Sequence, residues 1–200
     1  MPNLNHILST RRSIRRYHAE AVPMQMVEQL LTAAQWAPSA HNRQPWRFVV
    51  LTDKVERAKL AQAMAQQLQI DRLADGATPA VVQADAERSQ ARILEAPLAI
   101  LACVSMAEMD TYPDAIRNEN EYLMAVQSCA MAVQNLLLQA HALGLGACWM
   151  CAPLFCPQTV QAALTLPSDW RAQALITIGF PASAGKPAIR KALHEVTQWR

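Results

Sequence analysis

Four arginines lie within six consecutive positions near the start of the chain, where residues 11–16 read RRSIRR. Cations this close repel one another unless an anion neutralises them, and a guanidinium can donate two parallel hydrogen bonds to a phosphate. Ser13 adds a hydroxyl donor to the cluster. The segment is therefore a candidate phosphate site, and a solvated basic helix end is the alternative interpretation.

A polar loop bounded by prolines follows, in which residues 37–46 read APSAHNRQPW. Ser39, Asn42 and Gln44 together offer the donors and acceptors that an uncharged polar ring requires. The alternative is an ordinary turn in which serine and asparagine satisfy their own backbone. His41 has no evident partner that would make it a catalyst. A phosphate grip and a polar loop together suggest a bound flavin mononucleotide (FMN), and hence a redox enzyme.

The composition sets limits on the class of protein. The 200 residues, 52% hydrophobic and 17% charged, predict one globular domain over residues 1–200 with a proper core. A net charge of +2 argues against a nucleic-acid-binding surface. The apolar stretch 122–145 is interrupted by polar residues, which favours a buried helix over a membrane span, and no signal peptide is visible. We therefore expect a cytoplasmic protein with no membrane partner.

The five cysteines do not predict a disulfide framework, because their number is odd and no secretory signal precedes them. Residues 148–151 read CWMC, a spacing that occurs in thioredoxin-like redox sites and in zinc sites. A second such pair and a neighbouring histidine are both missing from the sequence. Small buried side chains are the favoured interpretation, and no metal site is expected.

The hydrophobic pattern alternates helices with a few strands. We expect helices at 23–37, 54–68, 119–142 and 157–164, and strands at 46–51, 97–104, 146–150 and 174–180. Residues 71–92 are predicted to be a mobile polar excursion with some helix, and 186–200 a mostly irregular basic tail. Helix 119–142 is apolar around nearly its whole circumference, so it belongs in a core or a subunit interface, with Gly144 as its C-cap. The pattern predicts an α+β domain with three α/β/α layers.

These segments together resemble the FMN-dependent nitroreductase family over almost the whole chain, and other nucleotide or hydrolase signatures are missing. The resemblance rests on residues 11–15, on 37–48, on QNLLL at 134–138 followed by GLG at 144–146, and on IRK at 189–191 before EV at 195–196. The CWMC segment with Phe155 and Cys156 is most similar to a subgroup that includes the flavin domain of deazaflavin-coenzyme ligases. The family's fold has a central, mostly antiparallel sheet flanked by helices, with the long buried helix at a dimer interface.

The resemblance implies a homodimer with two FMN sites, each built by both subunits. The phosphate would be held by residues of one subunit, namely Arg11, Arg12, Ser13 and Arg190, with Lys191 as a weaker candidate. Arg15 would face the flavin N1 and C2 carbonyl. The other subunit would contribute Pro38, Ser39, Ala40, Asn42 and Gln44. Trp149 and Met150 would lie against the ring, and the backbone of Cys151 and Ala152 would approach N5 and O4.

The activity implied is transfer of hydride from NADH or NADPH to a nitroaromatic, quinone or other conjugated acceptor by a ping-pong mechanism. The cofactor performs that chemistry, so no side chain is required as nucleophile or base. The alternatives are a flavin-dependent reductase of deazaflavin-coenzyme biosynthesis, an enzyme that cleaves flavin, and a non-catalytic flavin-binding protein. Two departures from the family pattern stand out. Ala40 replaces a common hydroxyl residue, and no mid-chain residue is assigned to the pyrimidine edge of the flavin. The acceptor and the choice between NADH and NADPH stay open.

Overall fold

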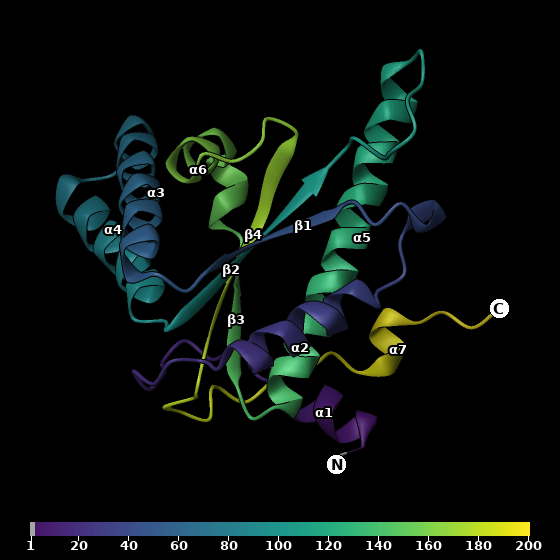
Figure 1. The fold of residues 1–200 in the computed structure, drawn as a ribbon, viewed down its shortest axis with the longest axis horizontal. Helices are drawn as coiled ribbons and strands as arrows, with labels where there is room; N and C mark the ends of the chain where they lie inside the picture. Colours follow the sequence, from purple (N-terminus) through teal and green to yellow (C-terminus); the bar gives the residue numbers. More distant parts are fainter. Residues whose placement is uncertain (1–2) are drawn as a thin grey trace.

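The protein has three layers, as a computed structural model that describes residues 3–200 shows (Figure 1). The middle layer is a sheet of β1 (Trp46–Leu51), β2 (Leu98–Ser105), β4 (Trp170–Gly179) and β3 (Gly146–Met150), in that spatial order. Every neighbouring pair of these strands is antiparallel. The α+β class and the antiparallel sheet predicted above are confirmed.

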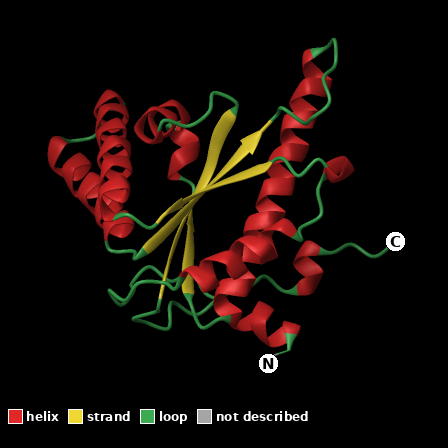
Figure 2. Cartoon of the chain, in the orientation of Figure 1, coloured by secondary structure: helices red, strands yellow, loops and turns green. Residues whose placement is uncertain are grey.

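Helices cover both faces of the sheet (Figures 1 and 2). One face carries α2 (Met24–Gln35) and α5 (Ala115–Ala142), and the other carries α3 (Lys54–Ala74), α4 (Pro79–Leu94) and α6 (Pro157–Leu164). Shorter elements are α1 (Leu4–Thr10), η1 (Ala40–Asn42), η2 (Ala152–Phe155) and α7 (Leu193–Val196). Neither α1 nor α7 was predicted, because both are short and carry no periodic apolar stripe.

The core lies on both sides of β2, all eight residues of which are buried. Successive side chains of a strand point to opposite faces. Ile100 therefore packs under α2 and α5 with Leu136, while Leu101 packs under α3 and α6 with Leu60. A strand covered on both faces explains the continuous apolar run in the sequence.

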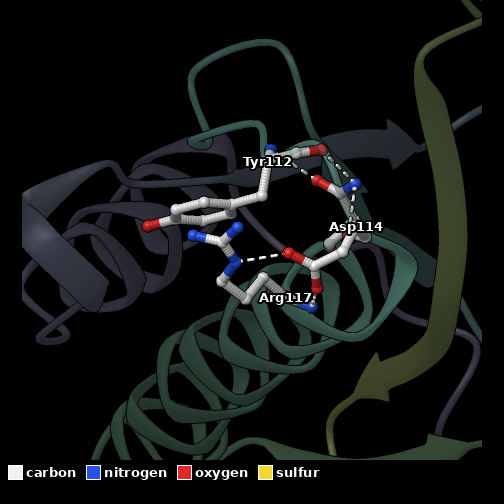
Figure 3. A network of polar contacts seen from close by, with 4 residues as sticks. Tyr112, Asp114 and Arg117 are labelled. Carbon is white, nitrogen blue, oxygen red and sulfur yellow. Dashed lines mark hydrogen bonds and ion pairs between the residues drawn. The ribbon is translucent and has the colours of Figure 1, made fainter.

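Helix α5 begins at Ala115 rather than at 119, because a polar network caps it (Figure 3). The Asp114 carboxylate accepts a hydrogen bond from the Arg117 backbone N–H, at 2.9 Å, and another from the Arg117 guanidinium. These bonds lower the pKa of Asp114. The Arg117 guanidinium also lies 4.7 Å from the centre of the Tyr112 ring, and Asn118 bonds the Tyr112 backbone. An N-cap aspartate is a local signal that the apolar pattern alone did not reveal.

The apolar surface of α5 is only partly covered within the chain. Ala125, Cys129 and Leu136 are buried against the sheet and α2, whereas Leu123 and Met131 are 52% and 39% exposed. By length and composition, α5 is also the one helix among residues 3–200 that could cross a membrane, and 44% of its apolar window is buried. Its packing against the sheet is that of a core helix.

Residues 71–92 differ from the prediction, because they form two regular helices instead of an excursion with some helix. Helix α3 continues to Ala74, and α4 begins at Pro79, which stands in the first turn as prolines often do. A hydrogen bond of 2.9 Å from Gln69 to Gln83 and an ion pair between Arg72 and Asp85 join the helices. Helix α4 buries only Val82, Ala86 and Ile93, so its apolar stripe is sparse among the polar residues of the segment.

Strand β4 starts at Trp170, four positions before the predicted start at 174, and ends at Gly179. The added residues include the polar Arg171 and Gln173, and the pairing of β4 with β2 shifts register between Ala102 and Cys103. An irregularity of this kind interrupts the alternation that a sequence pattern depends on. The strands at 46–51 and 146–150 and the helix at 157–164 match their predicted bounds.

Candidate functional site

The arginine segment is held in place by backbone pairing at the edge of the sheet. The Ile14 N–H donates to the Ala147 carbonyl of β3 at 3.0 Å, and the His18 N–H donates to the Phe180 carbonyl at 2.9 Å. The Ala182 N–H in turn donates to the Arg16 carbonyl at 3.0 Å. Residues 13–18 therefore lie between β3 and the chain that leaves β4.

This pairing is close enough to require a glycine in β3. A Cβ on Gly146 would lie 2.7 Å from Ile14 Cγ2, which is nearer than real side chains approach. Ile14 is buried, and the neighbouring Ser13 and Arg15 are exposed. Because side chains alternate along extended backbone, Ser13 and Arg15 point together away from the core.

The arginines of this segment have no carboxylate to neutralise them. Within residues 3–200, none of Arg11, Arg12, Arg15 and Arg16 has an acidic group within 4 Å, whereas the ion pairs that do form use Arg43, Arg72, Arg88 and Arg117. Arg12 Nη1 donates to the carbonyls of Ser9 and Arg11, so this side chain also ends α1. An unneutralised cluster on a fixed backbone is chemically suited to a phosphate.

A cavity of about 210 Å³ lies beside Arg11 and Arg12. Thr10 and His141 line it, and their side chains are joined by a hydrogen bond of 2.8 Å. Burial lowers the pKa of His141, and the nearby Arg11 lowers it further. Sequence reasoning missed both residues, because 131 positions separate them and neither belongs to a local motif.

Two arginines act electrostatically on Cys148, which lies near the middle of β3. Burial raises the pKa of the Cys148 thiol, while the positive charges of Arg15 and Arg92 oppose that rise. Both guanidinium groups therefore lie within electrostatic reach of Cys148. Arg92 comes from α4, in the segment that had no predicted role. No local motif pointed to Arg92, because Arg88, four positions before it, carries the same charge and such pairs disfavour a helix.

The chain after β3 exposes backbone donors. Within residues 3–200, the N–H groups of Cys151 and Ala152 have no backbone or side-chain acceptor. Free N–H groups here fit the predicted approach to a flavin N5 and O4. Trp149 and Met150, also predicted to contact the ring, are half-buried, and the Trp149 indole N–H donates to Cys151 Sγ at 3.1 Å.

The cysteines are free thiols, and most of them are structural. Cys148 is buried and Cys151 is exposed. Burial raises the pKa of Cys103 and of Cys129 to about 12, so both stay protonated in the core. No group of three or more histidine, cysteine or acidic side chains among residues 3–200 could hold a metal ion.

The 38–45 loop is held by hydrogen bonds and by an uncommon backbone. The Ala40 N–H donates to the Ser128 hydroxyl of α5 at 3.2 Å, and the Gln44 N–H donates to the Ser39 hydroxyl at 3.1 Å. His41, Asn42 and Gln44 have positive φ values of 49°, 53° and 49°. Non-glycine residues in this region carry strain that tends to persist at functional sites. Ser39 partly closes its own turn, as the alternative interpretation predicted.

The arginine segment and the 38–45 loop do not meet within one chain. Trp46, next to the loop, pairs with Val104 at one end of β2. Ala147, next to Ser13, pairs with Ile178, which pairs with Leu98 at the other end. Six residues of strand span about 20 Å, and β1 and β3 are opposite edges of the sheet. Figure 1 shows the same separation between the start of β1 and the start of β3.

The predicted tail residues stay apart from the cluster. Arg190 and Lys191 are exposed, and Arg190 Nη1 donates only to the neighbouring Ile189 carbonyl, at 3.0 Å. No hydrogen bond in the described part of the chain joins them to Arg11 or Ser13. The chain therefore brings Arg11, Ser13 and Arg15 together with the 148–152 segment, and leaves Pro38 to Gln44 and the tail elsewhere.

Comparison with known proteins identifies related chains. The sequence model of the nitroreductase family matches residues 8–180. An NADH dehydrogenase of Thermus thermophilus is 34% identical over 197 residues, which cover 95% of this chain and 92% of the relative. A 5,6-dimethylbenzimidazole synthase of Rhodospirillum rubrum is 31% identical over 191 residues, covering 89% of this chain and 82% of the relative. A solved structure from Desulfovibrio desulfuricans, described as a nitroreductase in complex with FMN, matches with a TM-score of 0.75 at 30% identity, over 100% of this chain and 98% of that one.

Proposed function

The chain belongs to the nitroreductase family, and we propose that it is a homodimeric FMN-dependent oxidoreductase that passes hydride from NADH or NADPH to a conjugated acceptor. The observation that carries this proposal is the cluster of arginines without carboxylate partners, fixed at the β3 edge beside free backbone N–H groups. Similarity to an NADH dehydrogenase and to a nitroreductase in complex with FMN supports the same function.

The phosphate end of the cofactor would lie at the start of the arginine segment. Arg11 and Ser13 would donate to phosphate oxygens, with Arg12 adding charge while it holds the end of α1. Arg190 and Lys191 lie in an exposed tail, so they would join the site only if the tail closes over it. Charge-assisted hydrogen bonds of this kind are the strongest that a protein offers to an anion.

The ring end would lie along residues 148–152. Arg15 and Arg92 would place positive charge at the pyrimidine edge, where negative charge develops on reduction, and so favour the reduced form. The Cys151 and Ala152 N–H groups would orient the N5 and O4 edge. Bound flavin supplies the hydride chemistry itself, and the chain supplies position and electrostatics.

A second copy of the chain is required to complete this site. The 38–45 loop lies about 20 Å from the arginine segment along the strand direction, so a single chain cannot place both on one flavin. Exposed apolar side chains are abundant: Trp36 is 83% exposed, Ile189 92% and Trp199 84%, besides Met131 on α5. Where such side chains lie together, they are suited to an interface with a second subunit. We propose that Pro38 to Gln44 of one subunit meets the arginines of the other.

The two substrates would use the same flavin face in turn, which is the structural basis of a ping-pong mechanism. No side chain of residues 148–152 is needed as a base, because the donor brings its own hydride. The residues of the chain bind, orient and exclude water at that face.

The proposal is tested by the colour and redox behaviour of the purified protein. We expect yellow protein with about one FMN per chain, bleaching under anaerobic NADH or NADPH, and recovery of the oxidised spectrum when p-benzoquinone is added. Initial rates should give parallel double-reciprocal lines. Colourless protein that fails to bind added FMN would contradict the proposal.

A second candidate is oxidative cleavage of the flavin, which the identity to the Rhodospirillum rubrum synthase favours. Reduced FMN incubated with the protein and oxygen would then yield 5,6-dimethylbenzimidazole, detected by mass spectrometry. Absence of 5,6-dimethylbenzimidazole, together with rapid reduction of p-benzoquinone, would exclude flavin cleavage and support the reductase. Protein that binds FMN but turns over with no donor would be a flavin-binding protein only.

A further inference from the structure

A small cavity of about 90 Å³ lies between α3, α4 and η2, next to the predicted flavin position. Ala152 lines it, and Ala152 is also one of the two residues expected to contact the N5 and O4 edge. Met64, Leu68 and Cys156 form an apolar wall. A dry cavity of about 150 Å³ holds a benzene molecule, so this smaller space can bury only part of one small ring.

The lining of this cavity also includes polar side chains, one of which is a carboxylate. Asp71 lies on α3 and is held by a 2.8 Å hydrogen bond from Gln67, whose own carbonyl oxygen accepts from Thr159 at 3.3 Å. No basic group lies within 4 Å of Asp71 among residues 3–200. The Asp71 charge reaches the apolar wall, since it contributes to a raised pKa of the Cys156 thiol.

The charge of this cavity is thus opposite to that of the arginine segment. Arg11, Arg15 and Arg92 gather where the phosphate and the pyrimidine edge are expected, while a lone carboxylate stands beside the N5 edge. Ser89 of α4 adds a hydroxyl to the lining of this cavity. A ligand here meets a hydrogen-bond acceptor and a negative charge, and an anion would meet repulsion without a compensating donor cation.

We propose that this cavity is the acceptor subsite, and that Asp71 selects small aromatic acceptors with a cationic or hydrogen-bond-donating substituent over anionic ones. The inference rests on the proposed function, because it names the substrate class of that same site. The ring would lie against Met64 and Leu68 with its substituent toward Asp71, and its reducible group toward Ala152.

The experiment uses three matched nitroaromatics with the FMN-loaded protein: 4-nitrobenzylamine, which is a cation at pH 7, neutral nitrobenzene, and anionic 4-nitrobenzoate. Equilibrium binding to the oxidised protein is measured by calorimetry, so no turnover is needed, and kcat/KM is measured with NADH. Because Asp71 is exposed, we expect Asp71→Asn to lower the affinity ratio of cation to anion by about threefold to fivefold. Asp71→Lys should invert the preference.

The control is Asp75→Asn, which removes the same charge four positions further along the chain, at the C-cap of α3 and outside the cavity. It should leave both the ratio and the rate at which NADH reduces the flavin unchanged. An equal ratio in the wild type, Asp71→Asn and Asp71→Lys would overturn the inference while leaving the reductase intact. Protein without FMN would instead overturn the proposed function, and the subsite with it.

Discussion

The arginine segment and the 38–45 loop are both predicted to contact one cofactor, but different interactions hold them in place. Residues 13–18 are extended and paired on both sides, with β3 and with the chain after β4. The loop instead depends on Ser39 and Ser128 hydroxyls and on three left-handed residues. The first region carries unpaired positive charge on extended backbone. The second has three residues with left-handed backbone, and its one arginine, Arg43, is paired with Asp110.

Because of this difference, changes in the two regions should affect FMN binding and the stability of the fold in different ways. Removing a charge from the arginine segment should weaken binding without loosening the fold, because its backbone pairing remains. Relaxing the loop should change stability as well, because its conformation is itself unfavourable. The two regions also lie at opposite ends of the sheet, so a change that separates two subunits should disable both at once.

The largest effect is expected from charges on the exposed stripe of α5. Leu123→Glu with Met131→Glu places two carboxylates where we expect the partner subunit. Subunits should separate, and loss of the loop contacts should raise the Kd for FMN more than about 100-fold, the equivalent of two or three hydrogen bonds. Light scattering after gel filtration measures the mass, and flavin fluorescence measures release.

The control for this change is a similar substitution on another helix. Leu73→Glu introduces a charge at an exposed apolar position of α3. It should leave both the mass and the FMN content as in the wild type. A double variant that runs as a monomer yet keeps its FMN would show that one chain suffices, against the proposed sharing of the site.

A smaller effect is expected from Arg11→Ala. Loss of one charge-assisted hydrogen bond to phosphate should raise the Kd for FMN roughly 10-fold to 100-fold. Arg16→Ala removes the same charge from the same segment, but Arg16 is not among the predicted phosphate ligands, so it should cost far less. FMN titration followed by fluorescence quenching gives both values. Equal increases of the Kd in the two variants would indicate a general effect of charge instead of specific binding of the phosphate by Arg11.

The loop is tested by relaxing its strain. His41→Gly should stabilise the protein by about 0.5 kcal/mol, because relief of a left-handed residue slightly exceeds the entropy that glycine adds to the unfolded chain. Gln44→Gly should give a similar gain, and in addition raise the Kd for FMN about threefold through a lost hydrogen bond. Urea unfolding and FMN titration measure the two effects. Lower stability of both variants would show that the left-handed backbone at these two positions is not strained.

The sequence was sufficient where signals were local. Strand β1, with its β-branched and aromatic residues, and α6, which begins at Pro157, match their predicted bounds. The composition of residues 11–16 alone was enough to predict a candidate phosphate site there. In contrast, the end of α3 and the whole of α4 were expected only as an excursion with some helix, and no role was predicted for Arg92, whose charge acts on Cys148 only in the folded chain.

Tertiary proximity explains the other omissions. Asp71 meets Ala152 at one cavity only after folding, and Thr10 meets His141 across the whole chain. The early start of α5 depended on Asp114, a cap that a search for apolar periodicity passes over. Motifs in the sequence therefore give candidate binding residues, whereas the packing of the folded chain decides which charges lie near them.

The smallest expected effect concerns His141, which lies beside the arginine segment and not beside the loop. Burial and the charge of Arg11 lower its pKa below 6.5 in the folded state, so the unfolded chain takes up a proton first as the pH falls. The apoprotein should therefore lose stability from His141 as the pH drops through 6.5 toward the lowered value, and His141→Gln should remove that part of the slope. Urea unfolding midpoints at pH 7.5, 6.5 and 5.5 measure this dependence of stability on pH.

Bound FMN would place its phosphate beside the same cations and so favour protonated His141. The loss of stability with falling pH should then be smaller than in the apoprotein. A slope that FMN does not change would place the phosphate away from Arg11 and His141.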